Sequence, residues 1–328
     1  MRIFSRVQLC FLFIYVAAAG NPAHGDTLDE VRERGYLLCG ITENSPAFST
    51  INENGERAGM DIDHCKTVSA AVFGKISVEY VSLTPHTAFT TLQSGGVDLF
   101  CGGASWTYLR DTALGLDFSG IYYYGGQGFI VHKDLGVSRV RELDGATVCV
   151  AQGTTNEQNL ADYFYSRGLT YTALTFSDFD KGLHAYHMRR CDAFTTNRAG
   201  LAIRAMKFPD RDRHVILPDL ISKEPQAAVV RQGDPRWRDI VFWSLNVRVA
   251  AEELNINQSN VAMLRANSTD PETRRLLGVT GGLGKRLGLS NEWAYNVIYL
   301  VGNYNDIWTR NFGYTGLERP TSTVYAAN

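Results

Sequence analysis

Residues 147–164 read TVCVAQGTTNEQNLADYF, and this stretch indicates the fold class of the chain. Residues 147–151 have the apolar run typical of a buried strand, and residues 155–166 have the length and spacing of a helix. Between them, Thr154 and Glu157 have the spacing of a capping box, which marks the first turn of a helix. A strand, a short loop with glycine and a capped helix form part of an α/β unit.

The same alternation of strands and helices extends outward and occurs twice. The first unit is predicted from helix 26–35, strand 36–41, helix 60–72, strand 76–81, helix 87–92 and strand 97–101. The second is predicted from strands 129–132, 147–151, 171–176 and 193–196 and helices 155–166 and 180–188. Two successive units of similar size predict an α/β protein with two lobes, each a sheet flanked by helices.

The domain boundaries are predicted from a glycine-rich segment and from the length of chain that follows the second unit. Three glycines follow a tyrosine run, so residues 124–128 are a predicted hinge, with a second crossing near 224–228. A strand at 227–230 and a long helix at 235–255 come next, and too little chain remains for a third full domain. The expected division is a signal peptide 1–25, lobe 1 over 26–124, lobe 2 over 125–228, a return to lobe 1 with a C-terminal helical extension over 229–313, and a tail 314–328.

The amino-terminal residues have the pattern of a secretory signal. Arg2 and Arg6 precede a mostly apolar stretch over 7–19. Ala23 and Gly25 are spaced like the −3 and −1 positions of a cleavage site. Cleavage a few residues earlier is also possible, and a buried N-terminal helix is the alternative, although no capping signal supports it. We therefore expect an exported, periplasmic protein without a lipid anchor.

Charge and cysteine content narrow the function classes. Removing residues 1–25 takes away two arginines and no acidic residue, so the formal net charge changes from −2 to −4. Such a balance lacks the basic face of a nucleic-acid-binding protein. The mature chain holds Cys39, Cys65, Cys101, Cys149 and Cys191, without C-x-x-C zinc spacing. Export predicts disulfides, and the odd number predicts one free thiol.

Two clusters could hold a carboxylate. The first has Ser105 and Arg110 after the strand at 97–101, where a hydroxyl and a guanidinium can meet a carboxylate together. Pairing of Arg110 with Asp111 or Asp117 is the alternative, and the chemistry of this cluster alone favours it.

The second cluster is Gly153, Thr154 and Thr155, where a helix N-terminus presents free N–H groups to an anion. A well-capped helix without a ligand is the alternative. One cluster per lobe is what a binder that closes over its ligand needs. Phe48 and the tyrosines at 122–124 could form apolar walls, although we expect at least two of the three tyrosines to pack in the core.

Enzyme and metal motifs are weak. The chain lacks the G-x-S-x-G and H-E-x-x-H patterns, and residues 281–288 fail the spacing of a phosphate loop. His184 and His187 share a helical face near Cys191, but that cysteine is expected to be oxidised, so no metal site and no cofactor are predicted.

Four stretches carry a resemblance to a known family. They are RDTALGLDFSGIYYYGGQGF (110–129), TVCVAQGTTNEQNLADYF (147–164), ISKEPQAAVVRQGD (221–234) and RLGLSNEWAYNV (286–297). In this order they resemble the general L-amino-acid-binding proteins of polar amino-acid ABC importers, within bacterial solute-binding protein family 3, over about residues 27–313. The resemblance implies a type II periplasmic-binding-protein fold with a ligand cleft between the lobes. It also implies a monomer that binds a small amino-acid-like ligand and delivers it to an ABC permease.

The resemblance also assigns roles. Arg110 matches the arginine that binds the ligand α-carboxylate, with Ser105 as the hydroxyl before it. Thr154 matches the second lobe's carboxylate contact, and Phe48 matches an aromatic position of the first loop. The implied disulfides are Cys39–Cys65 and Cys149–Cys191, which leaves Cys101 as a buried free thiol.

One position departs from the family pattern. The family usually has an aspartate for the ligand ammonium where this chain has Asn197, which can accept a hydrogen bond but has no charge. Binding could be weaker by roughly tenfold or more, Asp178 or Asp192 could compensate, or the ligand could differ from a standard α-amino acid. A ligand sensor for a membrane receptor and a periplasmic dehydratase-like enzyme on the same fold are the alternatives to import.

Overall fold

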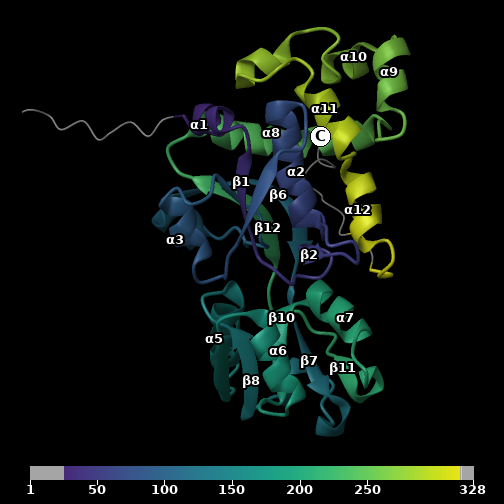
Figure 1. The fold of residues 1–328 in the computed structure, drawn as a ribbon. Helices are drawn as coiled ribbons and strands as arrows, with labels where there is room; N and C mark the ends of the chain where they lie inside the picture. Colours follow the sequence, from purple (N-terminus) through teal and green to yellow (C-terminus); the bar gives the residue numbers. More distant parts are fainter. Residues whose placement is uncertain (1–25, 318, 320–328) are drawn as a thin grey trace, which may run out of the picture.

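The computed structural model describes residues 26–317 and residue 319. The predicted signal peptide and most of the predicted tail lie outside the described residues. The described chain forms two α/β units, which lie one above the other in Figure 1. Within these residues, no helix is long and apolar enough to cross a membrane.

The first unit, lobe 1, is built on a five-stranded sheet (Figure 1). Its strands lie in the order β4 (Val78–Ser82), β1 (Leu37–Ile41), β5 (Leu99–Phe100), β12 (Glu224–Arg231) and β6 (Leu116–Gly125). The strand β1 is parallel to β4 and β5, whereas β12 is antiparallel to β5 and β6. A short hairpin is made by β2 (Thr50–Ile51) and β3 (Arg57–Ala58).

Helices from both ends of the chain surround this sheet. The amino-terminal group is α1 (Thr27–Arg34), α2 (Met60–Phe73), α3 (Ala88–Gln93) and α4 (Tyr108–Ala113). The carboxy-terminal group is α8 (Pro235–Glu253), α9 (Val261–Asn267), α10 (Pro271–Leu276), α11 (Trp293–Leu300) and α12 (Tyr304–Phe312). Side chains of both groups share one hydrophobic core, in which Leu28, Trp237, Ile298 and Phe312 are buried. Burying this common apolar surface explains why the chain returns to lobe 1.

The second unit, lobe 2, has its own five-stranded sheet. Its strands lie in the order β11 (His214–Ile216), β7 (Gln127–His132), β10 (Ala193–Asn197), β8 (Ala146–Ala151) and β9 (Tyr171–Phe176). Three helices accompany this sheet, α5 (Thr155–Ser166), α6 (Phe179–His187) and α7 (Arg198–Met206). Its separate hydrophobic clusters include Phe129, Phe164 and Phe194.

Two crossings join the units. The strand β6 ends at Gly125 and β7 begins at Gln127, while the chain returns through β12, which begins at Glu224. Glu224 is paired with Gly125 across the antiparallel ladder, so the two crossings lie side by side. The predicted domain boundaries fall close to these crossings and stay a prediction.

The secondary structure agrees with the sequence patterns where the periodicity is strong. The predicted helix 155–166 and strand 171–176 coincide with α5 and β9. The long strand β6 was not predicted, because its tyrosine run and three glycines obscure the period-two alternation.

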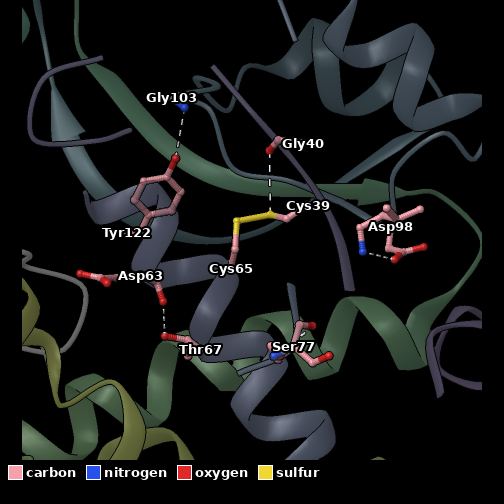
Figure 2. The surroundings of a disulfide bond; sticks show 11 residues. Cys39, Gly40, Asp63, Cys65, Thr67, Ser77, Asp98, Gly103 and Tyr122 are labelled. Atoms are coloured by element: carbon pink, nitrogen blue, oxygen red, sulfur yellow. Dashed lines mark hydrogen bonds between the residues drawn. A yellow bond between two sulfur atoms is a disulfide. The ribbon is translucent and has the colours of Figure 1, made fainter. Parts of the chain in front are cut away.

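The structure contains both disulfides that the family resemblance implies. Cys39–Cys65 joins β1 to α2 in lobe 1, as Figure 2 shows, and Cys149–Cys191 lies in lobe 2. Cys101 is a buried free thiol whose sulfur lies within 4.8 Å of the Cys39 and Cys65 sulfurs. Burial raises the pKa of the Cys101 thiol, and the Asp61 charge adds to this. The thiolate that would attack the disulfide is therefore disfavoured.

Asp61 is a buried carboxyl group whose oxygens lack a well-formed hydrogen bond within the described chain. Burial raises its pKa to about 7, and the nearby Tyr122 hydroxyl offsets only part of this. Two residues along α2, Asp63 is also buried but accepts hydrogen bonds from Arg310 Nη2 at 2.9 Å and Asn311 Nδ2 at 2.7 Å. The two buried aspartates therefore differ in their partners, because Asp63 is paired and Asp61 is not.

The raised pKa predicts a stability that falls with pH. The unfolded chain releases the Asp61 proton near pH 4, whereas the native state keeps it up to about pH 7. The free energy of unfolding therefore decreases across this window, and the penalty is complete above pH 7. We expect Asp61→Asn to stabilise the protein by about 1–3 kcal/mol at pH 8 and to have little effect at pH 4.

Urea denaturation of both proteins at the two pH values measures this difference. Asp63→Asn is the matched variant, and it should destabilise the protein at pH 8 because it weakens a paired buried carboxylate. A destabilising effect of Asp61→Asn at pH 8 would contradict the account.

Candidate functional site

A cavity lies between the two lobes, and residues of both line it. Lobe 1 contributes Thr42, Ser45, Phe48, Pro85, Ala88, Phe89, Phe100, Gly102, Gly103, Ala104 and Arg110. Lobe 2 contributes Thr154, Thr155, Asn156, Phe179, Thr196, Asn197, Gly200 and Arg204. The returning strand β12 adds Glu224 and Gln226. The cavity thus combines aromatic walls with a few charged and amide groups, as ligand sites do.

The lobes also touch each other beside this cavity. Arg204 Nη2 of lobe 2 donates a hydrogen bond of 2.6 Å to the Asn44 carbonyl oxygen of lobe 1. The Thr155 hydroxyl lies 3.5 Å from the Ser105 hydroxyl across the same gap. These contacts indicate that the structure represents a closed arrangement of the lobes.

Arg110 is held in place by its own short helix and the loop before it. The Thr107 side chain caps α4 by accepting from the Arg110 backbone N–H at 3.3 Å. The guanidinium donates to the Ser105 carbonyl oxygen at 3.1 Å and lies over the Phe89 ring, 5.0 Å from its centroid. Neither Asp111 nor Asp117 forms an ion pair with it in the described chain, so the alternative pairing is wrong.

Two opposing effects act on the pKa of the Arg110 guanidinium. Burial lowers the pKa of its guanidinium, and the Glu224 charge opposes this effect. With one nitrogen held by a backbone carbonyl, the remaining N–H groups of Arg110 can bind a carboxylate in the cavity.

Ser105 is placed differently from the other predicted residues. It is buried and forms an antiparallel bridge with Gln226, while the adjacent Trp106 N–H donates to the Pro225 carbonyl oxygen. Ser105 is not among the residues that line the cavity. Its carbonyl oxygen orients Arg110, so its contribution in this structure is to position that residue.

The start of α5 forms the second predicted cluster. The Thr154 hydroxyl donates to the Ala151 carbonyl oxygen at 2.7 Å and accepts the Glu157 N–H at 3.4 Å, as a helix cap does. The Glu157 carboxylate accepts the Gly153 N–H at 2.9 Å. The N–H groups of Thr155 and Asn156 belong to the first turn of the helix, where the helix itself supplies no acceptor. They offer donors to an anion at the positive end of the helix dipole.

Phe48 lies on a loop with two residues in the left-handed region, Asn44 at φ 54° and Ala47 at φ 64°. Its ring packs edge-on against Tyr123, with centroids 4.9 Å apart, and also lines the cavity. Gly59 supports the loop from behind, because a Cβ atom there would lie 2.1 Å from the Phe48 carbonyl oxygen. Backbone strain of this kind often accompanies a binding loop.

The three tyrosines at 122–124 do not line the cavity. Tyr122 and Tyr123 are buried in the lobe 1 core, as expected for at least two of the three. The Tyr122 hydroxyl accepts the Gly103 N–H at 3.2 Å, which fixes a loop that does line the cavity (Figure 2). The aromatic walls are instead Phe48, Phe89, Phe100 and Phe179.

Asn197 lines the cavity from the end of β10 in lobe 2 and offers a hydrogen-bond donor. Its side-chain oxygen caps α7 by accepting the Ala199 N–H at 3.0 Å. Its Nδ2 group is buried without a partner in the described chain. A Cβ atom at Gly125 would lie 2.2 Å from this Nδ2, so any other residue at that position would require the Asn197 side chain to move.

Glu224 is the carboxylate of the cavity, and the sequence analysis missed it. Its Oε1 atom accepts hydrogen bonds from Thr155 Oγ1 at 3.1 Å, Asn156 Nδ2 at 3.0 Å and Asn159 Nδ2 at 3.2 Å. Burial raises its pKa, while the hydrogen bond from Thr155 and the Arg110 charge lower it. A hydrogen bond between Glu224 and the Ser222 side chain lowers this pKa further.

The two acids proposed to compensate for Asn197 do not do so. Asp178 caps α6 and pairs with Lys181 at 2.9 Å, and Asp192 accepts the Thr147 N–H at 2.8 Å. Neither lines the cavity. Glu224 lies in the motif ISKEPQAAVVRQGD, which the sequence analysis used only as evidence of family resemblance. The sequence does not show that Glu224 is buried at the crossing between the lobes, and this burial is what makes it a candidate site residue.

Comparisons with known proteins agree with this arrangement. Residues 37–277 match the family model of the bacterial extracellular solute-binding proteins, family 3. The chain belongs to this family. The match spans strands and helices of both lobes, so this family-3 protein has the two-lobed periplasmic-binding-protein fold.

Relatives of this family-3 protein cover most of its length. The glutamate/glutamine/aspartate/asparagine-binding protein of Rhodobacter capsulatus is 45% identical over 298 residues, covering 90% of this chain and 88% of the relative. The general L-amino acid-binding periplasmic protein of Rhizobium johnstonii is 42% identical, covering 91% and 88%. A solved structure of an ABC transporter periplasmic binding protein from Brucella ovis with glutathione bound has a TM-score of 0.85 and 42% identity, covering 89% and 92%.

Proposed function

We propose that this family-3 protein is the periplasmic substrate-binding component of an amino-acid ABC importer and presents its closed form to a membrane permease. The relatives named for amino-acid binding support the substrate class. The observation that carries the proposal is the pair of opposite charges, the half-buried Arg110 and the buried Glu224, on the wall of one cavity between the lobes. An α-amino acid has the matching carboxylate and ammonium on one carbon.

Each part of the site then has a role. Arg110 binds the α-carboxylate from lobe 1, and the free N–H groups at the start of α5 bind it from lobe 2. Glu224 binds the α-ammonium, which replaces the role of the missing aspartate at Asn197. The Nδ2 group of Asn197 donates to a ligand oxygen. The ligand thereby joins both lobes and stabilises the closed state, which acts as a monomer in the periplasm.

The two alternatives to import make different predictions. A sensor would bind the same ligands, and only the membrane partner would differ. An enzyme would need a proton donor or acceptor, and Glu224 is the titratable acid that lines the cavity. Three hydrogen bonds to its Oε1 oppose the effect of burial on its pKa, and an oxygen held by three donors suits a binding role. Consumption of a bound ligand by the purified protein would favour an enzyme.

The ligand class can be tested with a panel of compounds. L-Glutamate, L-glutamine, L-arginine and glutathione retain the α-amino and α-carboxylate groups, whereas glutarate and γ-aminobutyrate each lack that combination. A ligand that binds the native state raises the melting temperature. We expect shifts only with compounds of the first kind. Shifts with glutarate but with no amino acid would contradict the proposal.

Arg110→Ala should weaken binding of the best ligand at least about 100-fold, because an unpaired buried carboxylate costs about 2–5 kcal/mol. Isothermal titration calorimetry measures the affinity, and circular dichroism checks that the fold is intact. Arg198→Ala is the control, because Arg198 is exposed and lies outside the cavity wall. Unchanged affinity of a folded Arg110→Ala variant would exclude the assigned site.

Glu224→Gln should lower affinity for α-amino acids about tenfold, because a neutral amide loses the charge-assisted hydrogen bond to the ammonium. The same change should not weaken binding of a ligand that lacks the ammonium, such as the N-acetylated amino acid. Glu79→Gln, an exposed change in lobe 1, is the control for both titrations. An equal loss for both ligands would mean that Glu224 supports the structure and does not bind the ammonium.

A further inference from the structure

Three potential metal ligands meet at the edge of lobe 2. His187 is the last residue of α6, His214 is the first residue of β11, and Asp210 precedes the 3-10 turn η3 (Arg211–Arg213). One ligand atom of each lies within 4.8 Å of the others, and His214 Nε2 is 3.2 Å from Asp210 Oδ1. We infer that His187, Asp210 and His214 form a binding site for a divalent transition metal ion, with Zn²⁺ as the best match.

The three ligand atoms lie within reach of a tetrahedral site, since all are within 4.8 Å of one another. Zinc–ligand bonds of 2.0–2.1 Å separate neighbouring ligand atoms by about 3.3 Å. The 3.2 Å between His214 and Asp210 already matches this separation. His187 needs a shift of at most about 1.5 Å, which rotation of an imidazole at a helix end provides. Two imidazole nitrogens and one carboxylate favour zinc over calcium or magnesium, which prefer oxygen ligands.

A second set of contacts holds His214 in the orientation needed for a ligand. The Tyr186 hydroxyl lies 2.7 Å from His214 Nδ1, so the other ring nitrogen, Nε2, faces Asp210. The Tyr186 ring is buried and stacks on His132 with centroids 4.5 Å apart. His132 Nε2 in turn lies 3.2 Å from the Tyr186 carbonyl oxygen. Metal-binding histidines commonly have such a partner on the second nitrogen.

The three ligands differ in exposure, because His214 is buried whereas His187 and Asp210 are half-buried. Burial lowers the pKa of both His187 and His214, and neutral imidazole is the form that binds a metal. Phe208 packs against both rings, with centroids 4.2 Å from His187 and 5.0 Å from His214. The Asp210 side chain is 41% exposed, so an ion can enter from solvent and complete its coordination with water.

This metal site is separate from the amino-acid cavity. Phe179, at the start of α6, lines the cavity, whereas His187 lies at the other end of the helix, about 12 Å along its axis. None of the three metal ligands lines the cavity. Zinc would tie the end of α6 to the edge strand β11 and stabilise lobe 2 with or without a bound amino acid. The sequence pattern of His184, His187 and Cys191 differs from this site, because Cys191 is in a disulfide and His184 is exposed.

Titration of Zn²⁺ into the mature protein tests the site. The experiment uses protein without a histidine tag. Isothermal titration calorimetry is done at pH 7.5 in a buffer that does not bind zinc. We expect one ion per chain and a higher melting temperature in its presence. His187→Ala and Asp210→Asn should each weaken binding at least about tenfold, because a zinc site needs about three protein ligands.

His184→Ala is the matched control, because it removes an exposed histidine one turn earlier on the same helix. Its zinc affinity should equal that of the unmodified protein. The inference is overturned if the unmodified protein binds no zinc, if both ligand variants keep full affinity, or if only His184→Ala loses it. Circular dichroism of each variant separates loss of a ligand from loss of the fold. Amino-acid binding should be unchanged in all three variants, so this result is independent of the proposed transport function.

Discussion

The antiparallel pairing of β6 with β12 is the constraint on which the site depends. At the end of this ladder Gly125 faces Glu224, and from here both crossings enter lobe 2. The pairing therefore fixes Glu224 at the base of the cavity and brings Asn197 against the glycine of the other crossing. Small rotations of the crossings would change the distance between the two cavity walls while the sheets stay intact.

In the proposed function, the half-buried Arg110 and the buried Glu224 give the cavity its selectivity. Removing Arg110 and Glu224 from water is costly unless each is compensated. The carbonyl oxygen of Ser105 and the donors of α5 compensate them in part, and each influences the pKa of the other. A zwitterionic ligand completes both pairings at once, whereas a simple carboxylate leaves Glu224 unpaired. Under this proposal, Asn197 in place of an aspartate does not require the loss of amino-acid binding.

The sequence predicted those parts of the fold that depend on local patterns. The capping box at Thr154 and the period of residues 155–166 located α5, because caps and amphipathic spacing are encoded over few residues. Arg110, Thr154, Phe48 and Asn197 line the cavity, as their predicted roles require.

Residues whose neighbours come from distant segments were not predicted. Glu224 becomes a site residue only when β12 pairs with β6, and Arg204 only when α7 approaches the Asn44 loop. Likewise, His187 and His214 meet because β11 adds to the edge of the lobe 2 sheet beside β7.

Small-angle X-ray scattering of the mature protein with and without saturating L-glutamate or the best amino acid of the panel tests closure most directly. The account predicts that the radius of gyration falls when the ligand binds and approaches that of the closed structure. An unchanged radius at saturation, with binding confirmed by calorimetry, would contradict capture by closure of the lobes.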